Sequence, residues 1–334
     1  MKDILSLTLD KLNEQMQELG EKNFRAKQIY TWLHKEKKAN FDEMTNLSKE
    51  LREKLKNSFY IPIPKVFERT SESTNKYLLK FDESTIIESV LMKYSYGISL
   101  CVSTQAGCRM GCGFCASHVD GFVRDLTAGE ILAQVYNTEG VSNIVIMGIG
   151  EPLENYENTV DFIKIISSKE GQDLRQRGIT LSTCGLVDKI YRLADEKLQI
   201  TLAISLHAPN DEIRKKIMPI AKKNTMDELL KASKYYFEQT GRRISFEYAL
   251  IKDVNDSEDN AKELATLLKS TKMPFHVNVI ELNPVAESEF LPSSKKNIFL
   301  QTLKNNKVEA TLRKSQGKGI DAACGQLRNG QEVI

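Results

Sequence analysis

The chain has 334 residues, of which 41% are hydrophobic and 28% are charged. This composition excludes collagen-like, low-complexity and wholly disordered proteins, and the length allows about two domains of roughly 150 residues or one long α/β barrel. With 47 Lys and Arg against 45 Asp and Glu, the net charge of +2 gives no general attraction to nucleic acid, so RNA contacts would come from local basic patches.

The sequence argues against a membrane or secreted protein. No stretch approaches the roughly 18 consecutive apolar residues of a membrane helix, and Met1 to Ile4 do not begin the apolar run of a signal peptide. We therefore expect a cytoplasmic protein without a membrane partner. Six cysteines are too few for a disulfide scaffold in a chain of this length, which favours metal-binding or catalytic roles for them.

Helical periodicity dominates the first part of the chain. Apolar residues recur at three- and four-residue steps from Leu9 to Leu19, from Ile29 to Leu33 and from Leu47 to Leu55. The run Ile61-Pro62-Ile63-Pro64 cannot continue a helix, because proline lacks a backbone donor and restricts the residue before it. We predict a small helical accessory domain over residues 1–62.

Runs that favour β-structure follow. Lys76–Phe81 and Thr85–Met92 predict a hairpin in a segment, residues 63–97, that leads into the core. In residues 98–290, further β-rich runs alternate with stretches of helix length such as Ala128–Asn137. These runs are residues 98–103, 143–147, 179–182, 200–206, 244–250 and 276–282. The alternation predicts an α/β fold with a parallel sheet, either doubly wound or a partial barrel.

Residues 291–334 are expected to form an extension of this core. They contain a possible strand at Val308–Leu312 and a stretch at 316–327 that includes glycines 317, 319 and 325. Because glycine is conformationally permissive, the second stretch is predicted to be a mobile loop.

Three cysteines follow the first core strand within eight residues, in the sequence Cys108-Arg109-Met110-Gly111-Cys112-Gly113-Phe114-Cys115. A tight loop cannot bury three thiolates separately, so they point to one ion or cluster. A structural zinc would need a fourth ligand, such as a distant histidine or the nearby His118. A [4Fe-4S] cluster can use three cysteines and leave one iron for the amino and carboxylate groups of S-adenosylmethionine. The spacing resembles the radical S-adenosylmethionine (SAM) signature.

Further candidates fall at or just past the carboxyl ends of different predicted strands. They are Gly150 and Glu151, Ser182, Ser205-Leu206-His207, and Asn283. In barrels, this face carries the active site. The stretch Met147 to Pro152 resembles the superfamily's glycine-glutamate motif, in which backbone and carboxylate bind the amino group of the cofactor. The alternative for these positions is ordinary turn and capping residues.

Two further cysteines narrow the resemblance. The segments that carry it are Cys101-Val102-Ser103-Thr104-Gln105, the three-cysteine motif, Gly150-Glu151-Pro152-Leu153, Leu181-Ser182-Thr183, Ser205-Leu206-His207-Ala208-Pro209 and residues 321–327. Together they resemble the radical SAM RNA adenine methyltransferases of the RlmN/Cfr family. The likeness spans residues 85–327 and implies a partial (β/α)6 radical SAM barrel with a helical accessory domain and a C-terminal extension.

Within that family the chain most resembles the dual-specificity enzymes. These methylate C2 of adenosine in 23S rRNA at the peptidyl transferase centre and in tRNA beside the anticodon. The alternative is the relative that methylates C8 and confers antibiotic resistance; Pro152 and the Gly319–Ala322 context favour C2. Two other classes stay open: a non-methylating radical enzyme acting on a peptide or small molecule, and a non-catalytic RNA-binding module holding iron-sulfur or zinc.

The resemblance also implies a reaction that uses two SAM molecules per turnover. Cys324 would take a methyl group by direct displacement, and a 5′-deoxyadenosyl radical made from the second SAM would remove a hydrogen from it. The resulting methylene radical would add to the base and leave a covalent protein-RNA adduct. Glu88 matches the proton acceptor, and Cys101 matches the thiol that releases RNA through a transient disulfide with Cys324.

The remaining assignments follow from the same resemblance. The [4Fe-4S] cluster would be held by Cys108, Cys112 and Cys115, and a reducing system such as flavodoxin or ferredoxin would supply electrons. SAM would be bound by the seven residues at the strand ends. We expect a monomer.

Two groups of basic residues are either solvated surface or phosphate contacts around an extruded adenine. They are Arg25, Lys27, Lys35, Lys37, Lys38, Arg313, Lys314 and Lys318.

Overall fold

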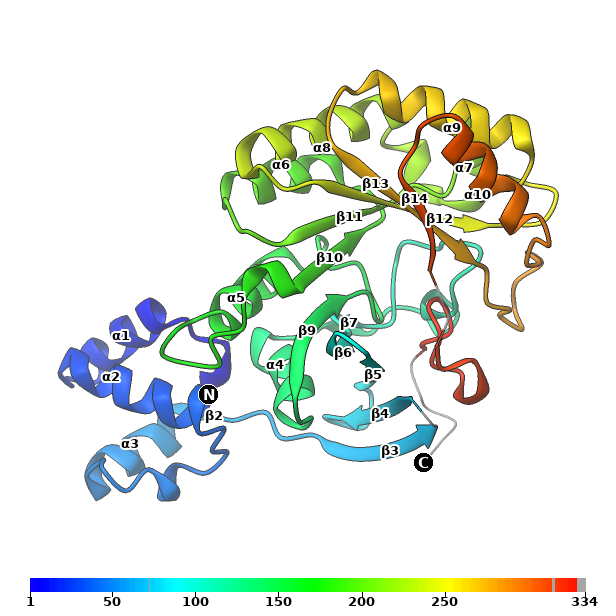
Figure 1. Cartoon of the computed structure of the whole chain (residues 1–334). Coiled ribbons are helices and arrows are strands. Elements are labelled where there is room, and N and C mark those ends of the chain that lie inside the picture. The colour runs from blue at the N-terminus through cyan, green and yellow to red at the C-terminus, as the bar shows by residue number, and fades with distance from the viewer. Residues whose placement is uncertain (72, 314–315, 329–334) are drawn as a thin grey trace.

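The computed structural model describes residues 1–71, 73–313 and 316–328, and Lys314 lies outside this range. A ten-stranded sheet runs through these residues in the order β14-β13-β12-β11-β10-β9-β6-β5-β4-β3 (Figure 1). Its strands are β3 (Lys65–Ser71), β4 (Thr74–Lys80), β5 (Ile86–Tyr94), β6 (Gly97–Val102), β9 (Val141–Ile146), β10 (Ile179–Thr183), β11 (Thr201–Ser205), β12 (Ile244–Leu250), β13 (Phe275–Glu281) and β14 (Ala310–Arg313).

The strands from β6 to β14 pair in parallel, and each lies beside its successor in the sequence. A doubly wound sheet would reverse its strand order at one point. Unbroken winding in one direction is the arrangement of a partial barrel, so the predicted fold class is confirmed. The first six of these strands are the six predicted β-rich runs, shifted by at most two residues at either end. Strand β14 adds a seventh from the C-terminal extension.

Three antiparallel strands extend the other edge of the sheet. Strands β4 and β5 form the predicted hairpin, and β5 pairs with β6. Strand β3, which pairs with β4, was not predicted. Its side chains are mostly exposed, so it lacks the alternation of apolar and polar residues that marks a half-buried strand.

Helices cover the outer face of the curved sheet (Figure 1). They are α4 (Ala128–Tyr136), α5 (Tyr156–Ile166), α6 (Val187–Asp195), α7 (Asp211–Ile217), α8 (Met226–Thr240), α9 (Glu258–Ser270) and α10 (Lys296–Asn305). Three of them begin with a reciprocal capping box, in which the Ncap hydroxyl and the side chain three residues later each bind a backbone N–H; these are α4, α8 and α9. No helix in the described residues is long and apolar enough to span a membrane.

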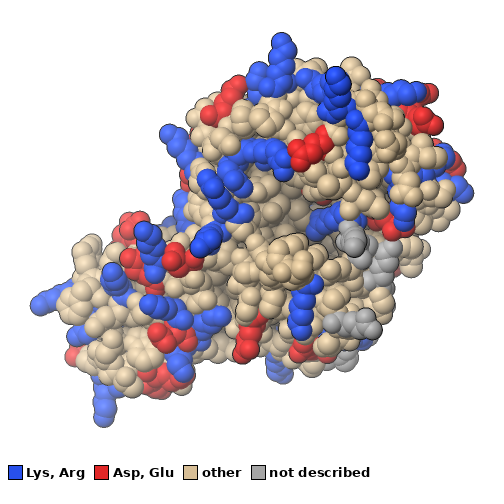
Figure 2. Space-filling model, viewed as in Figure 1, with Lys and Arg blue, Asp and Glu red and all other residues tan. Residues whose placement is uncertain are grey.

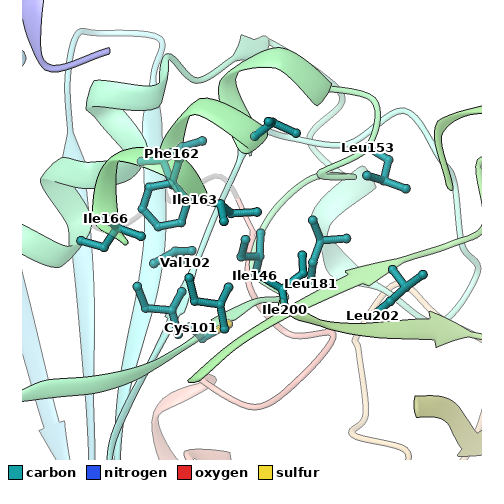
Figure 3. Close-up of a cluster of buried hydrophobic side chains, with 14 of the residues drawn as sticks. Cys101, Val102, Ile146, Leu153, Phe162, Ile163, Ile166, Leu181, Ile200 and Leu202 are labelled. Atoms are coloured by element: carbon teal, nitrogen blue, oxygen red, sulfur yellow. The ribbon is translucent and has the colours of Figure 1, made fainter. Parts of the chain in front are cut away.

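Branched apolar side chains fill the space between the sheet and these helices. Figure 3 shows part of this core, where Val102, Ile146 and Leu181 from three strands meet Phe162 and Ile163 of α5, and all five are essentially inaccessible to solvent. The sulfur of Cys101 lies in the same cluster. The core therefore holds the strands in fixed positions relative to one another, and the candidate site lies at their carboxyl ends.

The N-terminal residues form a helical unit beside α4 and α5 (Figure 1). Its elements are α1 (Leu9–Glu18), α2 (Asn23–Tyr30), a π-helical turn (Thr31–Lys35), α3 (Lys49–Ser58) and the short parallel pair β1 (Lys2–Asp3) and β2 (Phe59–Tyr60).

Specific contacts dock this unit on the start of α4. The Thr127 hydroxyl donates a 2.6 Å hydrogen bond to the Asp3 carboxylate, and the Gly129 N–H donates to the Ser6 hydroxyl at 2.8 Å. Only glycine fits at position 129, because a Cβ there would collide with that carboxylate. The helical unit is thus fixed to the sheet through the helix that follows β6.

Candidate active site

A cavity lies at the carboxyl ends of strands β9 to β13. Ten of the residues singled out in the sequence line it: Cys108, Cys112, Cys115, Gly150, Glu151, Ser182, Ser205, His207, Asn283 and Cys324. Leu206 does not line it, because its side chain is fully buried in the core. Residues far apart in the sequence are therefore brought to one cavity.

The three-cysteine loop follows the short strand β7 (Gln105–Ala106), which pairs with β8 (Arg124–Asp125). It packs against the end of α7, where the Gly113 N–H donates to the Ile217 carbonyl at 3.0 Å. Gly113 also lies against the ring of Phe290, since a Cβ at position 113 would be only 2.7 Å from that ring. These contacts hold Cys108, Cys112 and Cys115 on one wall of the cavity.

The donor set fits an iron-sulfur cluster. Burial raises the pKa of Cys108 to about 12 and raises that of Cys112 further, so these thiols stay protonated unless a metal stabilises the thiolates. Thiolates are the ligands that bind iron-sulfur clusters. Among the described residues, no three His, Cys, Asp or Glu side chains lie close enough together to hold a single metal ion. A multi-iron cluster does not need its ligands to converge on one point.

The turn after β9 places Glu151 beside this wall. Gly148 is required there, because a Cβ would come within 2.7 Å of the Val102 carbonyl oxygen. The Glu151 carboxylate accepts backbone N–H groups from Leu153 at 3.0 Å and from Cys184 at 2.8 Å. Burial raises the pKa of Glu151, and these hydrogen bonds oppose the increase. The fixed carboxylate is suited to an ammonium group in the cavity.

Polar side chains from β10 and β11 form the next part of the lining. The hydroxyls of Ser182 and Ser205 lie 3.3 Å apart. His207 accepts the Ala249 N–H through Nδ1 at 2.9 Å, so the neutral ring carries its proton on Nε2. Burial, assisted by Arg214, lowers the pKa of His207 to about 3. His207 is therefore a neutral donor whose ring stacks edge-on with Phe114 of the cysteine loop.

Arg214, which the sequence did not reveal as important, ties two of these strand ends together. Its guanidinium donates to the carbonyls of Cys184 at 2.6 Å, Ser205 at 3.2 Å and Leu206 at 3.2 Å, and the side chain is fully buried. Because the three acceptors lie at or just after the ends of β10 and β11, Arg214 holds the two serine-bearing ends at a fixed separation.

We predict that Arg214→Ala lowers the free energy of unfolding by about 3 kcal/mol or more, because three buried carbonyls would lose their donor. Denaturant unfolding measures this. Arg243→Ala is the control: its half-exposed ion pair with Glu309 should be worth only about 0–1 kcal/mol. Equal losses in the two variants would contradict the role given to Arg214.

Residues 321–328, which we call the Cys324 loop, lie against the cysteine loop. The Ala116 N–H donates to the Gly325 carbonyl at 2.7 Å, and the Ser117 hydroxyl donates to the Leu327 carbonyl at 2.8 Å. The Asn283 side-chain amide donates to the carbonyl of Cys324 itself at 3.0 Å. Asn283 therefore positions the Cys324 loop as well as lining the cavity.

Cys324 stands where the main cavity meets a smaller one. The smaller cavity is lined by Cys101, Cys324 and Arg313 among others, so the two cysteines face the same space. Burial raises the pKa of Cys101 to about 12, and the neighbouring Cys324 adds to the increase. Burial also raises the pKa of Cys324, while Arg313 opposes it. Cys324 has many neighbouring atoms, but its side chain is exposed to the two cavities that it lines.

Glu88 lies behind this loop on β5 and lines neither of these two cavities. Its Oε1 is 2.7 Å from Lys76 Nζ, and its Oε2 accepts the Arg328 N–H at 3.1 Å. Burial raises the pKa of Glu88, and the charges of Lys76 and Arg328 oppose the increase. The carboxylate thus contacts the Cys324 loop rather than the open part of the cavity.

Comparison with known proteins agrees with this arrangement. Residues 2–61 match the family model "Ribosomal RNA large subunit methyltransferase N-terminal domain", and residues 102–265 match the radical SAM superfamily. A probable dual-specificity RNA methyltransferase RlmN of Clostridium novyi (strain NT) is 52% identical, over 98% of both chains. Its counterpart in Clostridium perfringens (strain SM101) is 55% identical, over 98% of this chain and 97% of that protein.

The chain belongs to the RlmN family of radical SAM RNA methyltransferases. A crystal structure of a radical SAM methyltransferase from Sphaerobacter thermophilus superposes with a TM-score of 0.91 at 41% identity, covering 98% of this chain and 99% of that one. The family implies a [4Fe-4S] cluster and SAM. In this chain Cys108, Cys112 and Cys115 would hold the cluster, which supplies the electron that cleaves SAM.

The RlmN-family cavity also contains charged residues that the sequence analysis did not assign to it. Glu247 projects from β12; its Oε1 accepts from Ser245 and Asn278, each at 2.9 Å, whereas its Oε2 has no hydrogen-bond partner within the described residues. Arg313 lies 3.7 Å from that oxygen. A carboxylate inside the apolar run of residues 244–250 was the available signal for Glu247. The sequence indicated Arg313 only as a basic residue, either on the solvated surface or in contact with an RNA phosphate.

Cys184 also lines the cavity, but we assign it no part in the reaction and regard it as a packing residue. We predict that Cys184→Ala keeps at least about half of the methylation activity, since the Cys184 backbone N–H still binds Glu151 when the thiol, a weaker second donor to the same carboxylate, is removed, and one small buried side chain replaces another. Methylation of RNA by the reconstituted variant, beside its iron content, measures this. Loss of turnover in a folded, iron-loaded Cys184→Ala protein would show that its thiol has a role in the reaction.

Proposed function

We propose that this enzyme methylates C2 of adenosine in 23S rRNA at the peptidyl transferase centre and in tRNA next to the anticodon. The main support for this proposal is that Cys101 and Cys324 line one small cavity, which adjoins the cavity lined by Cys108, Cys112 and Cys115. One accessible cysteine next to the cofactor space can carry a methyl group, and a second cysteine beside it can resolve a covalent adduct.

The proposed reaction assigns each step to a residue of this chain. Cys324 would take up a methyl group for which one bound SAM is the donor, and a second bound SAM would provide the radical chemistry that activates this methyl. Gly150, Glu151, Ser182, Ser205, His207 and Asn283 hold the cofactor, and the backbone of Leu206 helps to place it. Glu88 accepts the proton from the ring carbon. The Cys101 thiolate then attacks the Cys324 sulfur, and the bond from that sulfur to the methylene carbon breaks. The electron pair of this bond moves to the carbon, which takes up a proton and becomes the methyl group of the RNA. The disulfide left between Cys101 and Cys324 must be reduced by a two-electron donor such as an external dithiol.

The substrate proposal is supported by the names of the relatives, which are dual-specificity RNA methyltransferases. Figure 2 shows Lys and Arg side chains around the hollow near the middle of the visible face, where an RNA backbone could be held while one adenine is extruded. We also propose a cytoplasmic, monomeric enzyme that receives electrons from a flavodoxin or ferredoxin.

Mass spectrometry of nucleosides from RNA treated with the reconstituted enzyme tests this function. We expect 2-methyladenosine in both rRNA and tRNA. Production of 8-methyladenosine would instead establish the C8 specificity of the resistance-conferring relatives. SAM cleavage without any methylated nucleoside would overturn the assignment of RNA as substrate.

A further inference from the structure

One buried ion pair holds both ends of the Cys324 loop. Lys76 on β4 lies 2.7 Å from Glu88 Oε1 and also donates to the Asp321 carbonyl at 3.0 Å. At the other end of the loop, the Arg328 N–H donates to Glu88 Oε2 at 3.1 Å. The positions three residues before and four residues after Cys324 are thus tied to the same two side chains.

These contacts involve buried charges, whereas the other ion pairs of the loop, from the Arg328 side chain to Glu287 and Asp120, are partly exposed. Lys76 and Glu88 are 11% and 5% exposed, so water and salt screen their attraction weakly. The contacts in the middle of the loop, from Asn283, Ala116 and Ser117, are neutral hydrogen bonds to its backbone carbonyls. Hydrogen bonds to an ionised acceptor are about twice as strong as neutral ones.

We propose that Lys76 and Glu88 form a clasp that keeps the Cys324 loop closed while Glu88 is ionised and loosens it when Glu88 is protonated. Lys76 is in this view a positioning residue, because it acts through Glu88 and through the Asp321 carbonyl. The charged groups that face the Glu88 carboxylate are Lys76 from β4 and Arg328 from the loop itself.

The consequence for turnover rests on the proposed function. When Glu88 accepts the proton, the ring C–H bond breaks, its electron pair stays in the ring, and the carboxylate becomes neutral. The attraction to Lys76 and the charge-assisted bond from the Arg328 N–H are then both lost. The loop loosens when the Cys324 sulfur must turn toward Cys101, so proton transfer and release of the adduct would be coupled.

The clasp should also respond to pH in the absence of RNA. Burial raises the pKa of Glu88 above its usual value, whereas the backbone N–H and the charge of Arg328, which the loop supplies, lower it. Loosening the loop removes these two contributions while Glu88 stays on β5, so the carboxylate binds a proton more tightly when the loop is open, and a fall in pH favours opening. Amide exchange in the Cys324 loop, corrected for its intrinsic pH dependence, should increase on mild acidification, and Glu88→Gln should abolish this response.

Hydrogen exchange of the reconstituted holoenzyme without RNA tests the clasp directly. We expect Glu88→Gln and Lys76→Met each to accelerate exchange of the amides in residues 321–328 by about tenfold or more, and Lys76→Arg to restore most of the protection. Glu287→Gln is the matched control, because Glu287 binds the Arg328 side chain at 2.9 Å in a partly exposed pair and should change exchange little. Unchanged exchange in α8 would show that the variants are folded.

Unchanged loop exchange in both Glu88→Gln and Lys76→Met would overturn the clasp, whatever the role of Glu88 in catalysis. An equal acceleration of exchange in Glu287→Gln would also overturn it, because loss of any carboxylate near the loop would then loosen the loop. If the loop loosens in Glu88→Gln but this variant methylates RNA at the normal rate, the clasp stands and the proton-accepting role of Glu88 fails. The two proposals are therefore separated by one variant.

Discussion

Replacing Cys108, Cys112 or Cys115 with alanine should abolish cluster assembly and with it all methylation that depends on radical chemistry. Each cysteine is proposed to supply one of only three protein ligands. Among the described residues, the other cysteines that line the cavity are Cys184, which is buried, and Cys324, to which we assign a different role. Iron and sulfide content after anaerobic reconstitution, together with reductive cleavage of SAM, measures the effect.

Cys184→Ala is the matched control for these variants, because it removes a cysteine from the same cavity without removing a proposed ligand. It should retain full iron content and SAM cleavage. A Cys108, Cys112 or Cys115 variant with wild-type iron content and cleavage would contradict the ligand assignment.

Cys101→Ala should stop the reaction after the carbon-carbon bond has formed, so that RNA stays covalently attached to the protein. The variant keeps the cluster ligands and Cys324, but it lacks the second thiol on the small cavity that can attack the Cys324 sulfur. Turnover should fall to a single event per enzyme at most. Denaturing gel electrophoresis with labelled RNA would show the adduct as a band that moves with the protein.

The double variant Cys101→Ala, Cys324→Ala is the control, because the proposed tether is the sulfur of Cys324 itself. It should form no adduct. Free methylated RNA released by Cys101→Ala at the normal rate would rule out the resolving role of Cys101.

Much of the fold was predictable because its core strands carry strong local signals. Five of the seven residues from Ile244 to Leu250 are apolar or aromatic, and the structure places β12 over the same residues. The cysteine motif was equally visible, since its ligands are close in sequence. By contrast, β3 lies at an exposed edge, where no periodic burial marks its residues.

The site was less predictable where it depends on contacts between distant segments. Glu88 and Arg328 are 240 positions apart, and no local pattern predicts that the carboxylate of one accepts the backbone N–H of the other. The same holds for Arg214, whose position on a short polar helix resembles a surface residue although its side chain is fully buried. Leu206 illustrates the opposite case: it belongs to a segment that lines the cavity, but its own side chain points into the core.

The intact mass of the purified wild-type enzyme after incubation with SAM, followed by peptide mapping, tests the role of Cys324 most directly. One methyl group should replace the thiol hydrogen of Cys324, and Cys324→Ala should lack it. A wild-type protein that methylates RNA while Cys324 is never found methylated would contradict the proposed role of Cys324 as the methyl carrier.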